Sequence, residues 1–249
     1  MIVFCIRMLD EPSDHISETP THAVKWPVMF QAWHRLTFLH WPYRPEVIRP
    51  LLPPHLELDL FGGAVWIGLT PFTVTMLRTP GLPVLPWISQ FPEMNVRTYV
   101  RGPDGERGVW FFSLEADRLA AVLGARVSYG LPYRWAEMQI RSGPGEIKYT
   151  SRRHFGPGQA TITIQNGSPI RPSELERFLT ARFRLYTILV GRLAFAQVQH
   201  APWPLESAKV LRLEQNVIEH SGLPIAIGQP FVHFSPGVYV RIGRPTFVR

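Results

Sequence analysis

The chain of 249 residues has one cysteine and three lysines, and it has no long hydrophobic run. The single cysteine, Cys5, excludes an internal disulfide framework. Its apolar segments are far shorter than the roughly 20 residues that span a bilayer, and its apolar start, residues 1–6, is too short for a secretory signal. We therefore expect a cytoplasmic protein that has no membrane partner.

The charge is basic but not clustered. Lysine and arginine together number 26 against 19 acidic residues, which gives a net charge of +7. Proteins that follow a phosphate backbone usually carry dense groups of basic residues with aromatic residues between them. Here the basic residues are nearly all arginines scattered along the chain, so we expect no nucleic-acid partner. Scattered arginine is better suited to binding a small anion.

Motifs for metals, nucleotides and serine nucleophiles are also missing. The nine histidines form neither an HxH nor an HExxH pattern, and the chain has no GxSxG element and no phosphate-binding glycine loop. We therefore expect neither a metal ion nor a cofactor.

Proline and glycine divide the chain into short segments. The 25 prolines and 19 glycines favour a mostly β protein with a few short helices over a series of βαβ units. We expect a mobile tail at residues 1–28 and a single β domain at 29–249, and a homo-oligomer is compatible with this organisation. Strands are expected at 34–40, 64–75, 94–100, 108–115, 125–129, 136–141, 147–154, 160–165, 183–190, 192–199, 210–214 and 238–242.

Three other segments have a recognisable local pattern. Residues 44–49 predict one or two helical turns, and Ser173 with Glu176 forms a capping box that opens a helix reaching about Ala181. The glycine-rich segment 102–108 predicts a hairpin between the strands on either side of it. Residues 77–92 are rich in proline and apolar side chains, which favours a packed loop or lid.

The most informative strand candidate runs from Glu93 to Val100, because polar side chains follow one another at every second position. Side chains on a strand alternate between its two faces, so one face carries Glu93, Asn95, Arg97 and Tyr99. The other face carries Met94, Val96, Thr98 and Val100, which is an ordinary core face. We interpret the polar face as the wall of an internal cavity. The alternative is a structural ion pair between Glu93 and Arg97.

Seven segments, in their order along the chain, resemble a known group, the YqjF-like bacterial proteins of unknown function. They are Phe38-Leu39-His40-Trp41, Leu51-Leu52-Pro53-Pro54, residues 93–100, Phe111-Phe112-Ser113-Leu114, residues 125–133, residues 182–186 and residues 200–205. This group is similar in turn to the acetoacetate decarboxylase superfamily. The resemblance implies a curved antiparallel β-barrel or cone around a central pocket, and Glu93 matches a pocket acid of that superfamily.

The resemblance also allows a comparison with the Schiff-base motif of the decarboxylase. In the decarboxylase, an arginine precedes a Gly-x-Pro-Lys-Lys element whose first lysine forms a Schiff base. Arg126, Gly130 and Pro132 match that pattern, but Tyr133 and Arg134 stand in place of the two lysines. A phenol forms no iminium and a guanidinium is not nucleophilic, so we expect no decarboxylation of acetoacetate through a Schiff base.

What remains is a pocket that suits a small anionic or carbonyl-bearing molecule. Glu93 and Tyr133 are the candidate catalytic residues, as acid or base and as donor to an oxyanion. The candidate ligand-binding residues are Asn95, Arg97, Tyr99, Arg126 and Arg134. We expect either a lyase, isomerase or hydrolase acting on a small keto or hydroxy acid without a Schiff base, or a ligand-binding or sensing protein with the same pocket and no turnover.

Overall fold

Strands dominate the computed structural model, which describes residues 16–248. The expected mobile tail therefore lies mostly outside the described residues, and the first strand begins at Pro27. The elements are β1 (Pro27–Tyr43), α1 (Pro45–Ile48), η1 (Arg49–Leu51), β2 (Glu57–Leu58), β3 (Val65–Arg78), β4 (Phe91–Arg101), β5 (Arg107–Ala116), α2 (Leu119–Tyr129), β6 (Tyr133–Gly143), β7 (Glu146–Arg153), β8 (Gln159–Pro169), α3 (Glu174–Thr180), β9 (Arg184–Leu189), β10 (Arg192–His200), β11 (Glu206–Gln215), η2 (Glu219–Ser221), β12 (Phe231–Gly243) and β13 (Thr246–Phe247).

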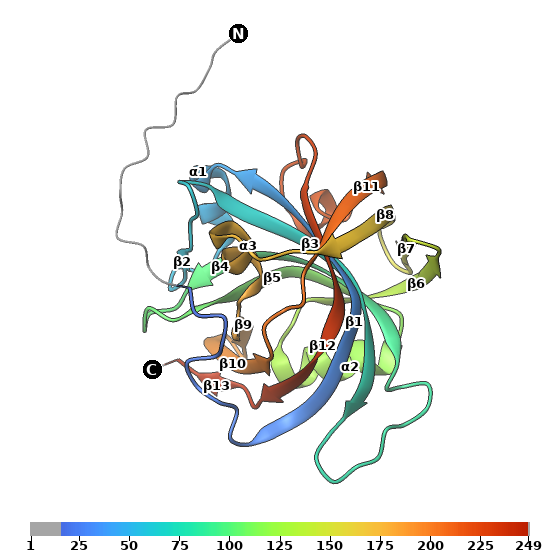
Figure 1. Cartoon of the computed structure of the whole chain (residues 1–249). Coiled ribbons are helices and arrows are strands. Elements are labelled where there is room, and N and C mark those ends of the chain that lie inside the picture. Colours follow the sequence, from blue (N-terminus) through green and yellow to red (C-terminus); the bar gives the residue numbers. More distant parts are fainter. Residues whose placement is uncertain (1–15, 249) are drawn as a thin grey trace.

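The strands form one strongly curved sheet that closes on itself twice (Figure 1). Pairing of β10 with β12 closes a smaller ring of β12, β1, β3, β4, β5, β9 and β10. Pairing of β5 with β4 also closes a larger ring, which runs from β5 through β6, β7, β8 and β11 to β12 and returns through β1, β3 and β4. The two rings therefore share the wall of strands β12, β1, β3, β4 and β5.

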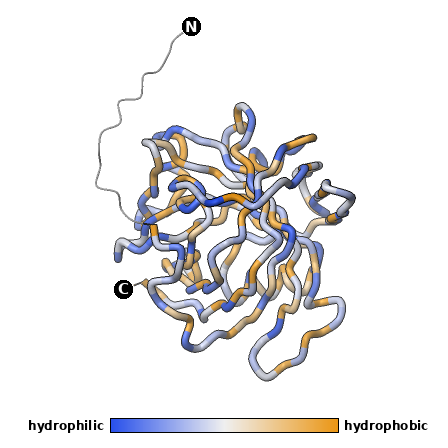
Figure 2. Tube along the Cα trace, in the orientation of Figure 1, coloured by the Kyte–Doolittle hydropathy of each residue, from blue (hydrophilic) through white to orange (hydrophobic). Residues whose placement is uncertain are grey.

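Each ring encloses its own hydrophobic core. One cluster, which includes Phe38, Phe72 and Leu185, has buried members on every strand of the smaller ring. A second cluster, which includes Trp41 and Ile162, lies within the larger ring. A strand in the shared wall is thus buried on both faces, and Figure 2 shows hydrophobic and hydrophilic residues alternating along the strands.

Strand β4 lies in this shared wall, and its two faces differ as expected from the sequence. Met94 and Val96 belong to the core of the larger ring. Glu93 and Asn95 face the smaller ring, where they line a cavity. The predicted hairpin is confirmed, since β4 and β5 pair antiparallel from Glu93–Ala116 to Arg101–Arg107. The polar face of β4 therefore lies inside the protein, on the side of the smaller ring.

The mostly β prediction is confirmed, but one predicted strand is wrong. Residues 125–129 belong to helix α2, which ends where Gly130 adopts a left-handed conformation (φ 65°) and its N–H donates to the Arg126 carbonyl. Helix α2 connects β5 to β6, and these two strands pair in parallel, as do β5 and β9. The sheet is therefore not purely antiparallel, because a helical crossover returns the chain in the same direction.

The remaining local predictions had mixed outcomes. The capping box of α3 is confirmed: the Ser173 side chain accepts from the Glu176 N–H, and the Glu176 carboxylate accepts from the Ser173 N–H. The loop at residues 79–90 is not packed but mostly exposed, with Ser89 as its buried residue. None of the helices within residues 16–248 is both long and apolar enough to cross a membrane.

Candidate functional site

A cavity of about 390 Å³ opens inside the smaller ring, between the shared wall, β9, β10 and helix α2. Most of its lining is aliphatic or aromatic, with Trp33, Phe72 and Trp203 among the larger side chains. Glu93, Asn95 and Arg97 of β4 contribute polar side chains to the lining, as does Tyr133 at the start of β6. Other segments contribute Gln31, Thr70, Ser128, Thr180, Arg182, Arg184 and His200. The spacing along β4 therefore predicted one part of the polar lining.

The Glu93 carboxyl group is the most perturbed acid at this site. Only 6% of the residue is exposed, and its Oε2 accepts a hydrogen bond of 3.0 Å from the Tyr133 hydroxyl. Burial raises the pKa of Glu93 to about 8, against the opposing effect of the Tyr133 hydrogen bond, and the charge of Glu115 adds to the rise. Glu93 is thus largely protonated at neutral pH and titrates close to it.

Glu93 and Tyr133, the two candidate catalytic residues from the sequence, are hydrogen-bonded to each other although they are 40 positions apart. Parallel pairing of β5 with β6 places Tyr133 opposite Leu114, and Leu114 in turn lies opposite Asn95 of β4. Burial and the neighbouring Glu93 charge raise the pKa of the Tyr133 hydroxyl well above 10, so this group stays a donor. No ion pair joins Glu93 to Arg97 among the described residues, so the purely structural alternative is not what the fold contains.

Several buried polar atoms in the cavity lining lack hydrogen-bond partners within residues 16–248. They are Thr70 Oγ1, Asn95 Oδ1, Arg97 Nε and Arg182 Nη2. Thr70 and Asn95 lie directly opposite each other on β3 and β4. Because an unsatisfied buried polar atom costs about 1–3 kcal/mol, such a group calls for an explanation, and a polar ligand is one.

Most N–H donors of the Arg97 guanidinium make no hydrogen bond to the described residues. Its Nη2 makes one long contact of 3.5 Å to the Leu179 carbonyl oxygen, and no carboxylate among the described residues pairs with it. The guanidinium carbon lies 5.5 Å from the centre of the Phe38 ring and 5.7 Å from that of Tyr99, so aromatic faces hold the charge in place. This arrangement suits a guanidinium that receives a carboxylate.

Tyr99 shares the polar face of β4 but does not line the cavity. Its hydroxyl donates to the Leu179 carbonyl at 2.7 Å and lies 2.6 Å from Nε2 of His40, so His40 donates to Tyr99. Burial and the Arg97 charge lower the pKa of His40 well below its usual value, which keeps the ring neutral. The Tyr99 ring therefore packs against the Arg97 guanidinium, and Tyr99 itself does not contact a ligand in the cavity.

The structure does not bring Arg126 and Arg134 into the cavity. Arg126 is exposed on α2, and its guanidinium donates to the Tyr133 carbonyl oxygen, at 2.7 Å from Nε. Arg134 is exposed on β6, one position after Tyr133 and therefore on the other face of the strand. Arg126 thus holds the backbone of Tyr133 while Tyr133 itself points to Glu93.

Two other cavity arginines are already paired. Arg182 donates to Asp59 at 2.5 Å and to the Phe178 carbonyl, and Arg184 donates to Asp104 at 2.6 Å. His200 also lines the cavity and contacts the Trp203 ring at 4.8 Å between centroids. Thr70 carried no signal in the sequence, because its place at the cavity depends on its partner strand.

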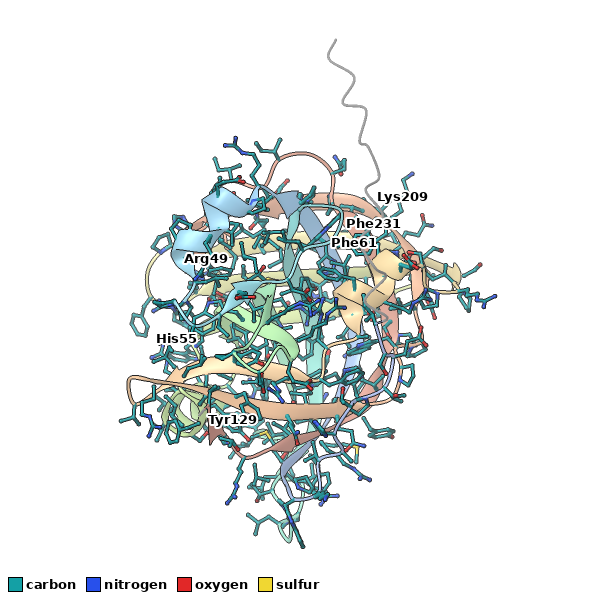
Figure 3. All side chains as sticks on the ribbon, turned by 90° about the vertical axis from the view of Figure 1, so that its left-hand side faces the viewer. Arg49, His55, Phe61, Tyr129, Lys209 and Phe231 are labelled. Atoms are coloured by element: carbon teal, nitrogen blue, oxygen red, sulfur yellow. The ribbon has the colours of Figure 1, made fainter. Side chains whose placement is uncertain are left out.

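The lysines lie away from this site. Lys25, Lys148 and Lys209 are all exposed, and none lines the cavity. Figure 3 shows Lys209 at the periphery of the molecule, on β11 of the larger ring. A Schiff base inside the cavity therefore has no amine to form it among the residues that line the cavity.

Comparison with known proteins identifies the family. The model of the DUF2071 family, described as an uncharacterized conserved protein, matches residues 30–239. The chain belongs to the DUF2071 family. A relative within the curated proteins is the uncharacterized protein YqjF of Bacillus subtilis (strain 168), which is 36% identical over 218 residues. The match covers 84% of this chain and 87% of that protein. The expected kinship with YqjF-like proteins is thus confirmed.

Solved structures confirm the acetoacetate decarboxylase-like fold for this DUF2071 chain. An acetoacetate decarboxylase-like enzyme from Sphingomonas wittichii RW1 has a TM-score of 0.65 at 10% identity, over 92% of this chain and 96% of that one. Acetoacetate decarboxylase from Legionella pneumophila has a TM-score of 0.58 at 17% identity, over 96% and 93%. The enduracididine biosynthesis enzyme MppR complexed with pyruvate has a TM-score of 0.63 at 12% identity, over 91% and 92%.

Proposed function

We propose that this protein binds a small carboxylic acid bearing a carbonyl group and transfers a proton at the carbon next to that carbonyl, without a Schiff base. Removal of that proton is the first step shared by many isomerases and lyases. The observation that carries the proposal is the buried Glu93–Tyr133 pair, which lies in a cavity beside unpartnered polar atoms of Thr70, Asn95 and Arg97.

Each group has a distinct task in this reaction. The Arg97 guanidinium binds the substrate carboxylate, and Asn95 and Thr70 help to orient the molecule. The ionised Glu93 takes the proton from carbon, so that the C–H bond breaks and an O–H bond forms on Glu93. The electron pair left behind moves into the carbonyl group, and the resulting enolate oxygen accepts a hydrogen bond from Tyr133.

The pKa of Glu93 fits this task. A carboxylic acid with a pKa of about 8 is ionised to roughly one tenth at pH 7, and its conjugate base is stronger than an ordinary carboxylate. The protonated acid can then return its proton to a different carbon, which isomerises the substrate, or deliver it to a leaving group, which completes an elimination. A group poised near the working pH serves both directions.

A structural neighbour gives independent support for the ligand class. The enzyme MppR, which shares the fold, is complexed with pyruvate in one structure and with the condensation product of pyruvate and imidazole 4-carboxaldehyde in another. Keto acids are thus accommodated by a related scaffold. The chemistry proposed here differs from that of the decarboxylase because no lysine lines the cavity.

A ligand-binding or sensing role with no turnover is the second candidate. One observation favours it: the other charged groups at the cavity, Arg182 and Arg184, are tied to Asp59 and Asp104, so Glu93 and Tyr133 have few partners for multistep chemistry. Binding of an acid through Arg97 would be the same in both cases. Only proton transfer distinguishes them.

The test follows exchange of the methyl protons of pyruvate for deuterium by NMR in D₂O. The wild-type protein should accelerate exchange, and Glu93→Gln should slow it by about a hundredfold or more because the base is lost. Arg97→Lys should raise the pyruvate concentration needed for half-maximal rate by about ten- to a hundredfold. Arg141→Lys is the matched control, since it makes the same change at an exposed residue outside the cavity, and its rate should equal that of the wild type.

The outcomes separate the two roles. Binding of pyruvate without exchange, measured by calorimetry on the same samples, favours the ligand-binding alternative. Exchange that persists in Glu93→Gln contradicts the assignment of the base. Equal losses in Arg97→Lys and Arg141→Lys would mean that arginine acts through the scaffold and not by contact with the substrate.

A further inference from the structure

The cavity is divided by polarity along strand β4. Arg97 and Glu93 are four residues apart, so at about 3.3 Å per residue their Cα atoms are separated by about 13 Å along the strand. Beyond Glu93, in the opposite direction from Arg97, the lining becomes apolar, with Phe91 of β4, Leu77 at the end of β3 and Ile88 of the following loop. A carboxylate held by Arg97 with its carbonyl near Glu93 would therefore point its remaining atoms into the apolar part.

Helix α2 forms one wall of that apolar part, at the bottom of Figure 1. It follows directly after β5, whose last residue, Ala116, lies opposite Glu93. Six α2 residues line the cavity. Five of them share one helical face and are small, namely Ala120, Ala121, Gly124, Ala125 and Ser128, and the sixth is Tyr129 at the end of the helix. A helix that packs against a core normally presents large aliphatic residues on that face, so small residues here leave space unfilled.

Gly124 shows that this space is not required by packing. A Cβ added at Gly124 would have no atom within 4 Å, and the residue has no left-handed conformation that would call for glycine. Glycine within a helix costs about 1 kcal/mol relative to alanine. Gly124 is exposed and also lines the cavity, so a larger side chain here would displace no packed atom and would reach the space that a ligand can occupy.

The loop beside this wall carries apolar side chains as well. The loop at residues 79–90 carries exposed side chains including Leu82, Leu85 and Trp87, of which Trp87 is 83% exposed. Arg118, at the start of α2, donates to the Trp87 carbonyl at 2.8 Å and so ties this loop to the helix. Ile88 of the same loop lines the cavity, so apolar side chains continue from this loop into the lining.

We propose that the acid taken by this protein carries an apolar tail, an alkyl chain or aromatic ring, that lies against the small-residue face of α2. This inference rests on the proposed function, because it assigns the carboxylate to Arg97 and the carbonyl to Glu93. A cavity of about 390 Å³ falls within the range of sites that enclose drug-sized ligands, whereas a three-carbon keto acid is far smaller. The polar side chains of β4 thus bind the carboxylate and the carbonyl group, and the small residues of α2 contact the tail.

The test measures dissociation constants by calorimetry for pyruvate, 2-oxohexanoate and 2-oxooctanoate. Wild-type affinity should rise with tail length, by up to about fourfold for each added methylene that is buried. Gly124→Leu places a side chain in the path of the tail, so it should weaken 2-oxooctanoate at least about tenfold and leave pyruvate unchanged. Leucine is a better helix former than glycine, so the variant should fold, and its melting temperature checks this.

Val127→Phe is the control, because it enlarges a side chain on the exposed face of the same helix. Its affinities should match those of the wild type for all three acids. Equal binding of all three acids by the wild type would overturn the tail assignment while leaving the proposed function intact. A tail effect that survives in Gly124→Leu would place the tail away from α2, and no binding by any of the acids would overturn both proposals.

Discussion

Replacing Glu93 with glutamine should change how the stability of the protein depends on pH. The pKa of Glu93 is about 8 in the folded protein, against 4.5 for an ordinary glutamate. The folded state therefore holds a proton that the unfolded chain releases once the pH exceeds 4.5. The stability contributed by the protonated group is complete below that pH and is lost progressively as the pH rises through 8. Above that, both states are ionised and the effect is constant.

The magnitude follows from the same two pKa values. At about 1.4 kcal/mol for each pH unit, a displacement from 4.5 to about 8 corresponds to about 5 kcal/mol between the acidic and basic limits. Between pH 5 and pH 9 the wild type should lose about 4 kcal/mol through this group, as an upper limit, since local relaxation on ionisation would reduce it. Glutamine stays neutral and its carbonyl can still accept from Tyr133, so Glu93→Gln should lack this loss.

The assay is urea unfolding of both proteins at several pH values between 5 and 9, and the quantity of interest is their difference in unfolding free energy. That difference should grow in favour of Glu93→Gln up to about pH 8 and then level off. Glu137→Gln is the matched control: Glu137 lies at the surface beside Arg152, which lowers its pKa, so its difference should stay flat. A flat difference for Glu93→Gln would refute the perturbed acid and weaken the proposed chemistry.

Two further predictions concern the other charged groups. Glu115→Ala should destabilise the fold by about 3–5 kcal/mol in urea unfolding, because it leaves Arg153 buried without the carboxylate that it contacts at 2.6 Å; Arg152→Ala, at an exposed ion pair, should have a much smaller effect, and equal losses would contradict this reasoning. Borohydride treatment with acetoacetate should leave the intact mass unchanged, since no lysine lines the cavity, and a reduced adduct on Lys148 or Lys209 would revive the Schiff-base mechanism.

How far the sequence could predict the site is clearest on β4. Alternation along a strand is a local property of the backbone, so the shared face of Glu93, Asn95 and Arg97 followed from their spacing alone. Tyr99 shows the limit of that argument. It occupies the same face, but the neighbouring His40 and the Leu179 carbonyl engage its hydroxyl, and neither could be placed from the spacing of one strand.

Helix α2 shows a second limit. Residues 125–129 include valine and tyrosine, which favour strands, while the alanine- and leucine-rich stretch before them and Gly130 after them favour a helix with a glycine end. The longer pattern decided the structure. Because Arg126 is helical and outside the cavity, a match in a sequence motif did not carry its side chain to the site.

The sequence by itself determined the β-rich class and the polar row of β4, because these depend on local backbone preference and on residue identity. Tertiary structure alone decided the partner of Glu93, the space over Gly124 and the unpartnered atoms of Thr70 and Asn95. Each of these depends on strands paired across long stretches of chain, through closure of the two rings and the parallel β5–β6 crossover. Pairings at such separations leave no local periodicity in the sequence.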